Sequence, residues 1–381
     1  MEIIIKATLK FLREADLVLL VFGIISTIYG VFLISSVTRN MPGTYISVQI
    51  GAFVIGIMLF VLFSYVDIDI IADKSWFLFA FSILFISSLF VWGEGDLVRR
   101  RAWIRLGEIS IQPAEIVKVT FIIIMARMIV TNKERKTLNS VVSILQIMAV
   151  FGVIFGFVLV VSQDIGTAMV YFAILIIMLF IGGLKLRWFA IGFVILAVAS
   201  PLIWINFFAE HMQDRILAPF FPDLVPEERL AAVLWQPDLS VRAISSGGFL
   251  GQGFGNGHLT QMHPGIFAQH TDFIFSAAGE ELGFVGCMLI VILLVTIISR
   301  CVYIGVKSNN PLGLLVCTGV AAKLIAQMIE NLGMNLGVMP VIGITLPFFS
   351  YGGSSLVTCF AALGIVSGIK MRPKPLRFRS L

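Results

Sequence analysis

The sequence predicts an all-α fold, a polytopic integral membrane protein with about ten transmembrane helices and a long extracytoplasmic loop between helices 7 and 8. Composition supports this class, because 59% of the 381 residues are hydrophobic, 13% are charged and the mean hydropathy is +1.01. These values exclude an ordinary soluble enzyme. Apolar runs of about 17–25 residues, enough to cross roughly 30 Å of hydrocarbon, recur along the chain. Backbone in lipid must satisfy its own hydrogen bonds, so each run is expected to be a helix.

No hydrophilic segment is left over for a separate soluble domain, so residues 1–381 are expected to form a single membrane domain. The residues before the first run include basic side chains but no small-residue cleavage site, which indicates an uncleaved anchor. Boundaries predicted in this way are accurate to about 2–4 residues. The predicted spans are 17–37, 46–66, 76–93, 112–131, 141–162, 165–182, 188–205, 273–299, 311–337 and 351–370.

The basic residues predict the orientation, because cytoplasmic loops accumulate Lys and Arg. If the N-terminus lies inside, most Lys and Arg residues fall on the inner side. The outer side receives Arg39, the arginines of 99–105 and three arginines of the 206–272 loop. Both termini are therefore expected in the cytoplasm. The net charge of +5 reflects this asymmetry and attraction to anionic lipid, and does not indicate nucleic acid as a partner.

Charged residues inside the spans predict a polar cavity. A charge at the centre of a membrane helix costs about 2.5–3.5 kcal/mol on insertion scales, so such residues usually face a cavity or a partner. Apart from Lys323 and Arg127, the buried charges are expected in the outer half of the membrane, which indicates one cavity open to the outside. The residues concerned are Glu115 and Lys118 at the start of the fourth span, Asp164 before the sixth, and Glu280 and Glu281 in the eighth.

Asp272 lies where the long polar loop enters the eighth span, and two interpretations of it remain open. A carboxylate there is either part of the outer cavity or a helix N-cap. Glu115 and Lys118, at i and i+3, are likewise either part of the cavity or a purely structural ion pair. The arginines of 99–105 are either functional or an ordinary solvated loop. Lys323, Gln327 and Glu330 share one face of the ninth span.

The segment 331–355, NLGMNLGVMPVIGITLPFFSYGGSS, resembles the signature of the SEDS family, the RodA, FtsW and SpoVE proteins of bacterial cell-wall synthesis. Pro340 and Pro347 stop a helix, and Gly343 lets backbones approach closely. A broken segment at membrane depth is tolerated only where it lines protein or water.

Other segments are similar to the same family, so the resemblance runs from about residue 16 to 371. Lys323 and Glu330 stand where that family is normally apolar, which suggests a local pair or an extra contact for Lys118. The similar segments are WIRLG at 103–107, QPAEIVK at 112–118, the glycine-rich AISSGGFLGQG at 243–253, and HTDFIF at 270–275 with Glu280 and Glu281.

The resemblance implies a peptidoglycan glycosyltransferase that polymerises lipid II at the outer face of the bacterial cytoplasmic membrane, for cell elongation and shape. It also implies that Asp272 is the essential catalytic carboxylate, which acts as a base by accepting the proton of the attacking sugar hydroxyl. The undecaprenyl pyrophosphate leaving group needs cations or oriented amides. The expected substrate-binding residues are Arg101, Arg105, Glu115, Lys118, Asp164, Gly247, Gly248, His270, Glu280, Glu281, Ser350, Gly352 and Gly353.

A divalent cation such as Mg²⁺ or Mn²⁺ is compatible with pyrophosphate chemistry, but the sequence shows no dedicated metal cage. Two rival functions are a lipid-linked sugar flippase and a non-catalytic scaffold of the wall-synthesis complex. Polymerisation of lipid II by the purified protein would distinguish both from an enzyme. The short N-terminus and tail favour the elongation protein over a division or sporulation role.

The resemblance further implies partners, namely lipid II, the growing glycan strand, a class B penicillin-binding protein and other wall-elongation proteins. The transpeptidase is expected to dock on spans eight and nine. Small residues permit close helix packing in lipid, although they also serve packing inside one chain. The glycines considered for this contact are Gly283, Gly286, Gly313 and Gly319.

Overall fold

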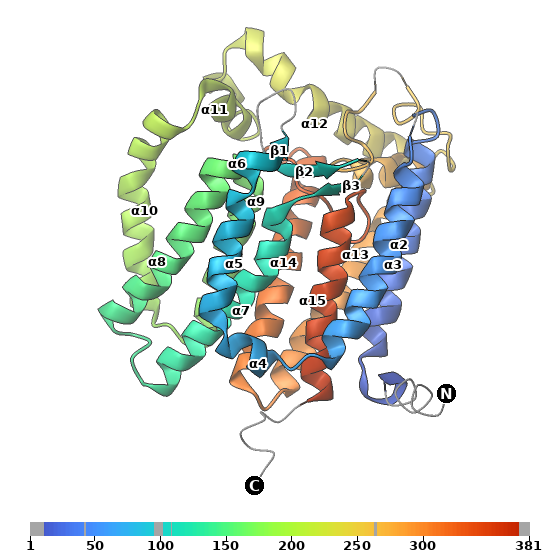
Figure 1. Cartoon of the computed structure of the whole chain (residues 1–381). Coiled ribbons are helices and arrows are strands. Elements are labelled where there is room, and N and C mark those ends of the chain that lie inside the picture. Colours follow the sequence, from blue (N-terminus) through green and yellow to red (C-terminus); the bar gives the residue numbers. More distant parts are fainter. Residues whose placement is uncertain (1–10, 42, 95–101, 108, 263–264, 373–381) are drawn as a thin grey trace.

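The computed structural model describes residues 11–41, 43–94, 102–107, 109–262 and 265–372. Long helices run side by side between two ends of the molecule (Figure 1). Within these ranges, nine helices are long and apolar enough to cross a membrane. A further helix, α7 (Pro113–Glu134), has 22 residues but carries charges near both ends. The prediction of a polytopic helical membrane protein is therefore confirmed, and each predicted span coincides with a helix to within a few residues at most ends.

The other helices follow the predicted order along the chain. Near the N-terminus they are α2 (Leu17–Val37), α3 (Tyr45–Tyr65), α4 (Ile68–Asp73), α5 (Ser75–Ser87) and α6 (Leu89–Trp92). After α7 come α8 (Val141–Phe157), the π-helical turn η1 (Val158–Ser162), α9 (Ile165–Gly182) and α10 (Leu186–Phe207). The C-terminal part contains α13 (Ile274–Lys307), α14 (Pro311–Asn335) and α15 (Gly353–Met371).

Two features at the end of the bundle opposite the start of α2 were not predicted (Figure 1). A small antiparallel sheet of order β1-β2-β3 is formed by β1 (Gly93–Glu94), β2 (Trp103–Leu106) and β3 (Ile109–Ile111). The 206–272 segment is also partly helical rather than an open loop. It contains α11 (Glu210–Leu217), the 3₁₀ turn η2 (Pro222–Leu224) and α12 (Glu227–Gly247), and Figure 1 shows α11 and α12 above the bundle, at the same end as the sheet. Strands of two to four residues are too short for an alternating pattern to predict them.

Helix α15 forms the centre of the bundle and packs along α3. Their backbones approach closely at glycines, since a Cβ added at Gly364 would lie 2.6 Å from the carbonyl oxygen of Phe60. A Cβ at Gly56 would likewise lie 2.8 Å from the ring of Phe360. Small residues therefore supply the close packing that lipid does not drive.

The glycines expected on the partner surface are used inside the chain instead, which corrects that prediction. A Cβ at Gly286 would lie 2.9 Å from the hydroxyl of Tyr29, and one at Gly319 would lie 2.5 Å from Ile122. A Cβ at Gly313 would meet Ile369 at 2.8 Å. These close approaches are intramolecular because α13 and α14 fold against α2, α7 and α15.

Gly283 breaks α13 and lets the loop after α12 join it. Its backbone is left-handed (φ 65°), a conformation that favours glycine. The loop N–H groups of Gln252 and Gly253 donate to the carbonyls of Glu280 and Glu281 at 2.9 and 3.0 Å. In return, the N–H groups of Phe284 and Val285 donate to the loop at 2.9 and 3.2 Å. The break is thus satisfied by exchanged backbone hydrogen bonds, as membrane depth requires.

At the opposite end, Asp16 connects three helices. Its side chain is fully buried, caps α2 through Leu19 N at 3.0 Å, and forms ion pairs with Arg300 of α13 at 2.7 Å and Lys370 of α15 at 3.1 Å. Burial by itself would raise the pKa of Asp16, but the hydrogen bonds from Arg300, Leu19 N and Lys370 outweigh it and hold this pKa below its usual value.

We expect Asp16→Asn to lower the free energy of unfolding by about 1–3 kcal/mol at neutral pH, because the amide keeps the cap but removes the anion. A depressed native pKa gives stability that is present above the unfolded pKa of about 4 and is lost as pH falls through the native pKa. The wild type should therefore approach the variant at acid pH. Thermal unfolding in micelles at several pH values measures this, with the exposed Glu14→Gln as control. Equal effects of both substitutions would contradict the prediction.

Candidate active site

A cavity of about 950 Å³ lies beneath the small sheet, at the same end of the bundle. Three helices, α7, α9 and α15, begin at this cavity, since residues of their first turns line it. Helix N-termini carry partial positive charge and exposed N–H groups, so this end of the bundle favours an anion. The polar or aromatic side chains of the lining are Ser47, Trp103, Arg105, Ser110, Gln112, Glu115, Asp164, Thr167, His270, Thr271, Asp272, Thr345, Tyr351 and Ser354.

Asp272 lines this cavity and is half-buried. It does not occupy the N-cap position, because α13 begins at Ile274 with Phe273 as its N-cap. Two side-chain amides hold its main chain, since Asn331 and Asn335 of α14 donate to the Asp272 carbonyl at 2.8 and 2.9 Å. The carboxylate is thereby presented from a segment whose backbone is tied to a neighbouring helix.

Ser350 does not line the cavity, and its side chain positions the segment that carries Asp272. Its buried hydroxyl donates to the carbonyl of Thr271 at 2.5 Å and accepts from Leu346 N at 2.8 Å. Next to it, Tyr351 N donates to the carbonyl of His270 at 2.8 Å. The broken segment before α15 and the segment before α13 therefore hold each other in place.

Gly352 and Gly353 line the cavity as expected. Gln49 of α3 is fully buried and bridges the turn beside them. Its amide nitrogen donates to the carbonyl of Ser350 at 3.1 Å, and its amide oxygen accepts from Gly352 N at 3.2 Å. A side chain with one donor and one acceptor group thus satisfies the irregular backbone that a strand or helix would otherwise pair.

His270 also lines the cavity, between two aromatic rings. The ring centroids of Tyr45 and Tyr351 lie 5.0 and 5.7 Å from its own. Its Nδ1 is buried without a hydrogen-bond partner in the described residues. Burial lowers the pKa of His270, so the imidazole is neutral at pH 7.

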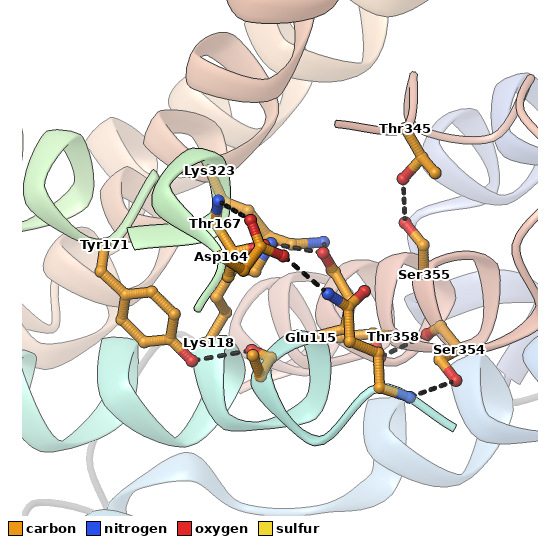
Figure 2. Close-up of polar contacts among 12 residues, drawn as sticks. Glu115, Lys118, Asp164, Thr167, Tyr171, Lys323, Thr345, Ser354, Ser355 and Thr358 are labelled. Carbon is orange, nitrogen blue, oxygen red and sulfur yellow. Dashed lines mark hydrogen bonds and ion pairs between the residues drawn. The ribbon is translucent and has the colours of Figure 1, made fainter. Parts of the chain in front are cut away.

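The ion pair expected from the i, i+3 spacing is present. Lys118 Nζ lies 2.5 Å from Glu115 Oε1, and both side chains are buried. Figure 2 shows this pair beside Asp164 and Thr167 of α9 and facing Ser354 and Thr358 of α15. Glu115 lines the cavity, whereas Lys118 lies behind it.

Lys323 of α14 approaches the same carboxylate from the other side. Its Nζ lies 3.8 Å from Glu115 Oε2 and donates to Cys359 Sγ at 3.2 Å. Of the two expectations for Lys323 and Glu330, the local pair is wrong, since the ionic partner of Lys323 among the described residues is Glu115, whereas Glu330 does interact electrostatically with Lys118. Lys323 and Glu330 are seven residues apart, so their side chains share one helix face but lie about 10 Å apart along the helix axis.

Asp164 lines the cavity as predicted and has a structural role as well. It caps α9 by accepting from Thr167 N at 2.9 Å and Thr167 Oγ1 at 2.8 Å. Gln112 Nε2, at the start of α7, donates to it at 3.0 Å. Asp164 therefore joins the first turns of two helices at the edge of the cavity.

Arg105 lies on β2 at the rim, where its side chain is half-exposed and 3.8 Å from Glu94. An exposed arginine can reach an anion that enters the cavity from outside. Arg101, the other arginine predicted to bind substrate, lies outside the described residues.

Glu280 and Glu281 do not line the cavity, which corrects their assignment to it. Glu280 accepts from Leu259 N and Thr260 N at 2.7 and 2.8 Å. Glu281 accepts from Ser36 Oγ at 2.6 Å, Gly255 N at 3.1 Å and Gln261 Nε2 at 3.2 Å. Both carboxylates thus hold the loop after α12. Buried carboxylates in this helix were compatible with either role, and only the fold brings the loop to them.

Gly247 and Gly248 do not line this cavity either. A Cβ at Gly247 would lie 1.9 Å from the carbonyl oxygen of Gly279, which shows that this glycine lets α12 contact α13. The carbonyl of Gly248 accepts from Phe284 N at 2.9 Å. Their backbone is used in packing at the break of α13.

Among the described residues, no three His, Cys, Asp or Glu side chains come together as ligands for a metal ion. The carboxylates that line the cavity come from separate elements, and Glu115 is paired with Lys118. A divalent cation therefore has no protein-built cage in that part of the chain.

Comparison with known proteins agrees with this architecture. The family model described as a cell cycle protein, FtsW/RodA/SpoVE, matches residues 11–374. The chain is 31% identical over 376 residues to a probable peptidoglycan glycosyltransferase FtsW of Trichlorobacter lovleyi, covering 95% of this chain and 96% of the relative. It is 27% identical to the peptidoglycan glycosyltransferase MrdB of Escherichia coli K12, covering 86% of each.

A chain of a solved peptidoglycan synthase complex, described as coordinating polymerization and crosslinking, superposes with a TM-score of 0.79 at 26% identity, covering 93% of this chain and 97% of that one. The family match spans almost the whole sequence, and the similar fold extends over the same length. The chain therefore belongs to the SEDS family, the FtsW, RodA and SpoVE proteins.

Proposed function

We propose that the chain is a peptidoglycan glycosyltransferase that polymerises lipid II into glycan strands at the outer face of the bacterial cytoplasmic membrane. The observation that carries the proposal is Asp272, a carboxylate held by its main chain at the edge of a cavity that favours anions. Relatives named peptidoglycan glycosyltransferase support it.

The proposed reaction follows from this arrangement. The sugar hydroxyl of one lipid-linked substrate attacks the anomeric carbon of the other, forming a new C–O bond. The bond from that carbon to the pyrophosphate oxygen breaks, and undecaprenyl pyrophosphate leaves with the electron pair. Asp272 accepts the hydroxyl proton. Arg105 and the N-termini of α7 and α15 stabilise the charge that develops on the leaving group.

The proposed topology places both chain ends in the cytoplasm and the cavity outside. Figure 1 shows the start of α2 and the end of α15 at one end of the bundle, opposite the sheet and α12. The positive-inside distribution of Lys and Arg assigns the first of these ends to the cytoplasm. A role in elongation stays a prediction, since relatives named both FtsW and MrdB match the chain.

The proposed partner is a class B penicillin-binding protein, whose single transmembrane helix docks on α13 and α14. The similarity to a chain of a peptidoglycan synthase complex supports a partner. Helix α13 presents an exposed apolar ridge for it, formed by Phe284, Met288, Leu289, Ile292 and Val295.

We expect Asp272→Asn to reduce lipid II polymerisation by roughly 100-fold or more, because the amide has nearly the same size but cannot accept the proton. Folding should survive, since the Asp272 contacts with Asn331 and Asn335 use its main-chain carbonyl. The assay uses purified protein with its partner in vesicles, and thermal unfolding checks the fold. Asp223→Asn, at an exposed position of η2, is the matched control. Near-normal turnover of the Asp272 variant would refute the assignment, and an inactive wild type would favour a flippase or scaffold.

We expect Glu115→Gln to destabilise the protein more than Lys118→Met. The first leaves Lys118 and Lys323 without their shared carboxylate, whereas the second leaves Lys323 beside Glu115. Breaking a buried pair on one side costs about 3–5 kcal/mol, and the double variant should cost less than the sum of the two. Thermal unfolding of the three variants measures this. Strictly additive losses would show that the two residues are not coupled.

We expect Ile292→Trp to weaken co-purification with the partner, because the larger side chain projects from the exposed ridge of α13. Val194→Trp, on the exposed face of α10, is the matched control for a bulky lipid-facing substitution. The measurement is the ratio of partner to chain after affinity purification in detergent. The same ratio for both variants and the wild type would place the interface on another helix.

A further inference from the structure

A single buried carboxylate lies between two buried ammonium groups. Lys118 Nζ is 2.5 Å from Glu115 Oε1, and Lys323 Nζ is 3.8 Å from Glu115 Oε2. Both lysine side chains are essentially inaccessible to solvent. Two ammonium groups on one carboxylate is more positive charge than a simple structural pair requires, and burying charge is costly unless it is compensated.

The two lysines hold Glu115 unequally. Lys118 forms a short, charge-assisted hydrogen bond, whereas Lys323 is within ion-pair range but beyond hydrogen-bond distance. Glu115 Oε2 has no hydrogen-bond partner among the described residues. This oxygen can therefore accept from Lys323 after a movement of about 1 Å.

The position of Glu115 and the two lysines relative to the cavity indicates why they hold this carboxylate unequally. Glu115 lines the cavity and both lysines lie behind it. Lysine is a flexible side chain with three donors, so its ammonium can change partners by rotating its own bonds. An anionic group in the cavity would compete with Glu115 for Lys118.

The surroundings on α14 lower the cost of such a change. Gln327 is fully buried, and neither its amide nitrogen nor its amide oxygen has a hydrogen-bond partner among the described residues. Glu330 Oε2, one turn further out, is also unpartnered there. Lys323, Gln327 and Glu330 share one helix face. The unused polar atoms of Gln327 and Glu330 are available to the Lys118 ammonium when it leaves Glu115.

We propose that Lys323 is a positioning residue that takes over the Glu115 carboxylate while Lys118 turns to the pyrophosphate of the lipid-linked substrate. The inference rests on the proposed function, because it assigns the anion to that substrate class. Lys323 acts through Glu115 and Lys118 and does not itself contact the substrate. Without it, release of Lys118 would leave Glu115 as an uncompensated buried charge.

The test measures the dissociation constant of undecaprenyl pyrophosphate for the purified full chain in micelles, with uncharged undecaprenol as the control ligand. Lys323→Met should weaken binding of the pyrophosphate by about tenfold or more and leave undecaprenol binding unchanged. Lys323→Arg, which keeps the charge, should bind within roughly threefold of the wild type. Thr318→Val, whose hydroxyl donates to the Leu314 carbonyl of the same helix at 2.8 Å, is the matched control on α14.

The combination with Lys118 separates positioning from a general structural role. If Lys323 acts through Lys118, adding Lys323→Met to Lys118→Met should weaken pyrophosphate binding no further than Lys118→Met alone. Additive losses, or a Lys323→Met variant that loses thermal stability but binds pyrophosphate normally, would overturn the proposal. If Lys323→Met does not fold, Lys323→Gln serves in the same cycle.

Polymerisation of lipid II by the wild type is measured in parallel and reports on the proposed function alone. If the wild type is inactive but its pyrophosphate binding depends on Lys323, the proposed glycosyltransferase function is refuted, and the proposed positioning role of Lys323 is supported. If the wild type is active but binds pyrophosphate equally well without Lys323, the glycosyltransferase function is supported, and the positioning role of Lys323 is refuted.

Discussion

The half of the molecule that contains the cavity depends on backbone hydrogen bonds that broken helices cannot make by themselves. At Gly283, α13 gives up its own pattern and exchanges four hydrogen bonds with the loop after α12. Lipid offers no replacement for a missing partner, so the exchange is required wherever a helix is interrupted at membrane depth. The loop is therefore as much a part of the membrane domain as the helix it joins.

Side-chain amides meet the same requirement at the other interruption, between α14 and α15. Gln49 uses both its donor and its acceptor on the turn at Ser350 and Gly352. Asn331 donates to the carbonyls of Asp272 and Ile344 at 2.8 and 2.7 Å. The irregular segments that border the cavity are thus fixed to α3 and α14. A reacting group on such a segment is held more firmly than its loop position suggests.

Charge follows a related logic. Among the carboxylates that line the cavity, Glu115 is balanced by Lys118 of its own helix and Lys323 of α14. Asp164, in contrast, accepts a hydrogen bond from the neutral amide of Gln112. Glu280 and Glu281 are bound by amide and backbone N–H donors of the loop they hold, and Glu281 also accepts from the hydroxyl of Ser36 in α2. Asp164, Glu280 and Glu281 all accept hydrogen bonds from uncharged donors, so the position of those donors in the fold, and not their chemical type, separates a carboxylate that lines the cavity from one that attaches the loop.

The sequence by itself determined the membrane class, the helices and the segments that border the cavity. Hydropathy and span length depend on local composition. The predicted span 165–182 therefore has the same bounds as the observed helix α9, Ile165–Gly182. The position of Asp272 was also predictable from its motif, as was the i, i+3 pair of Glu115 with Lys118. These features are read from continuous stretches of chain, from the i, i+3 spacing of the ion pair to about 20 residues for a span.

Only the tertiary structure decided which polar residues share the cavity. The Glu281 carboxylate lies away from the cavity because its hydrogen-bond donors come from two segments far away in sequence, Ser36 of α2 and Gly255 of the loop. Lys323 forms an ion pair with Glu115 because α14 packs against α7. The predicted depth of a charge gives its level in the membrane but not its direction around the helix axis. That direction is set by which helices pack together, and long-range packing is not encoded in any local pattern.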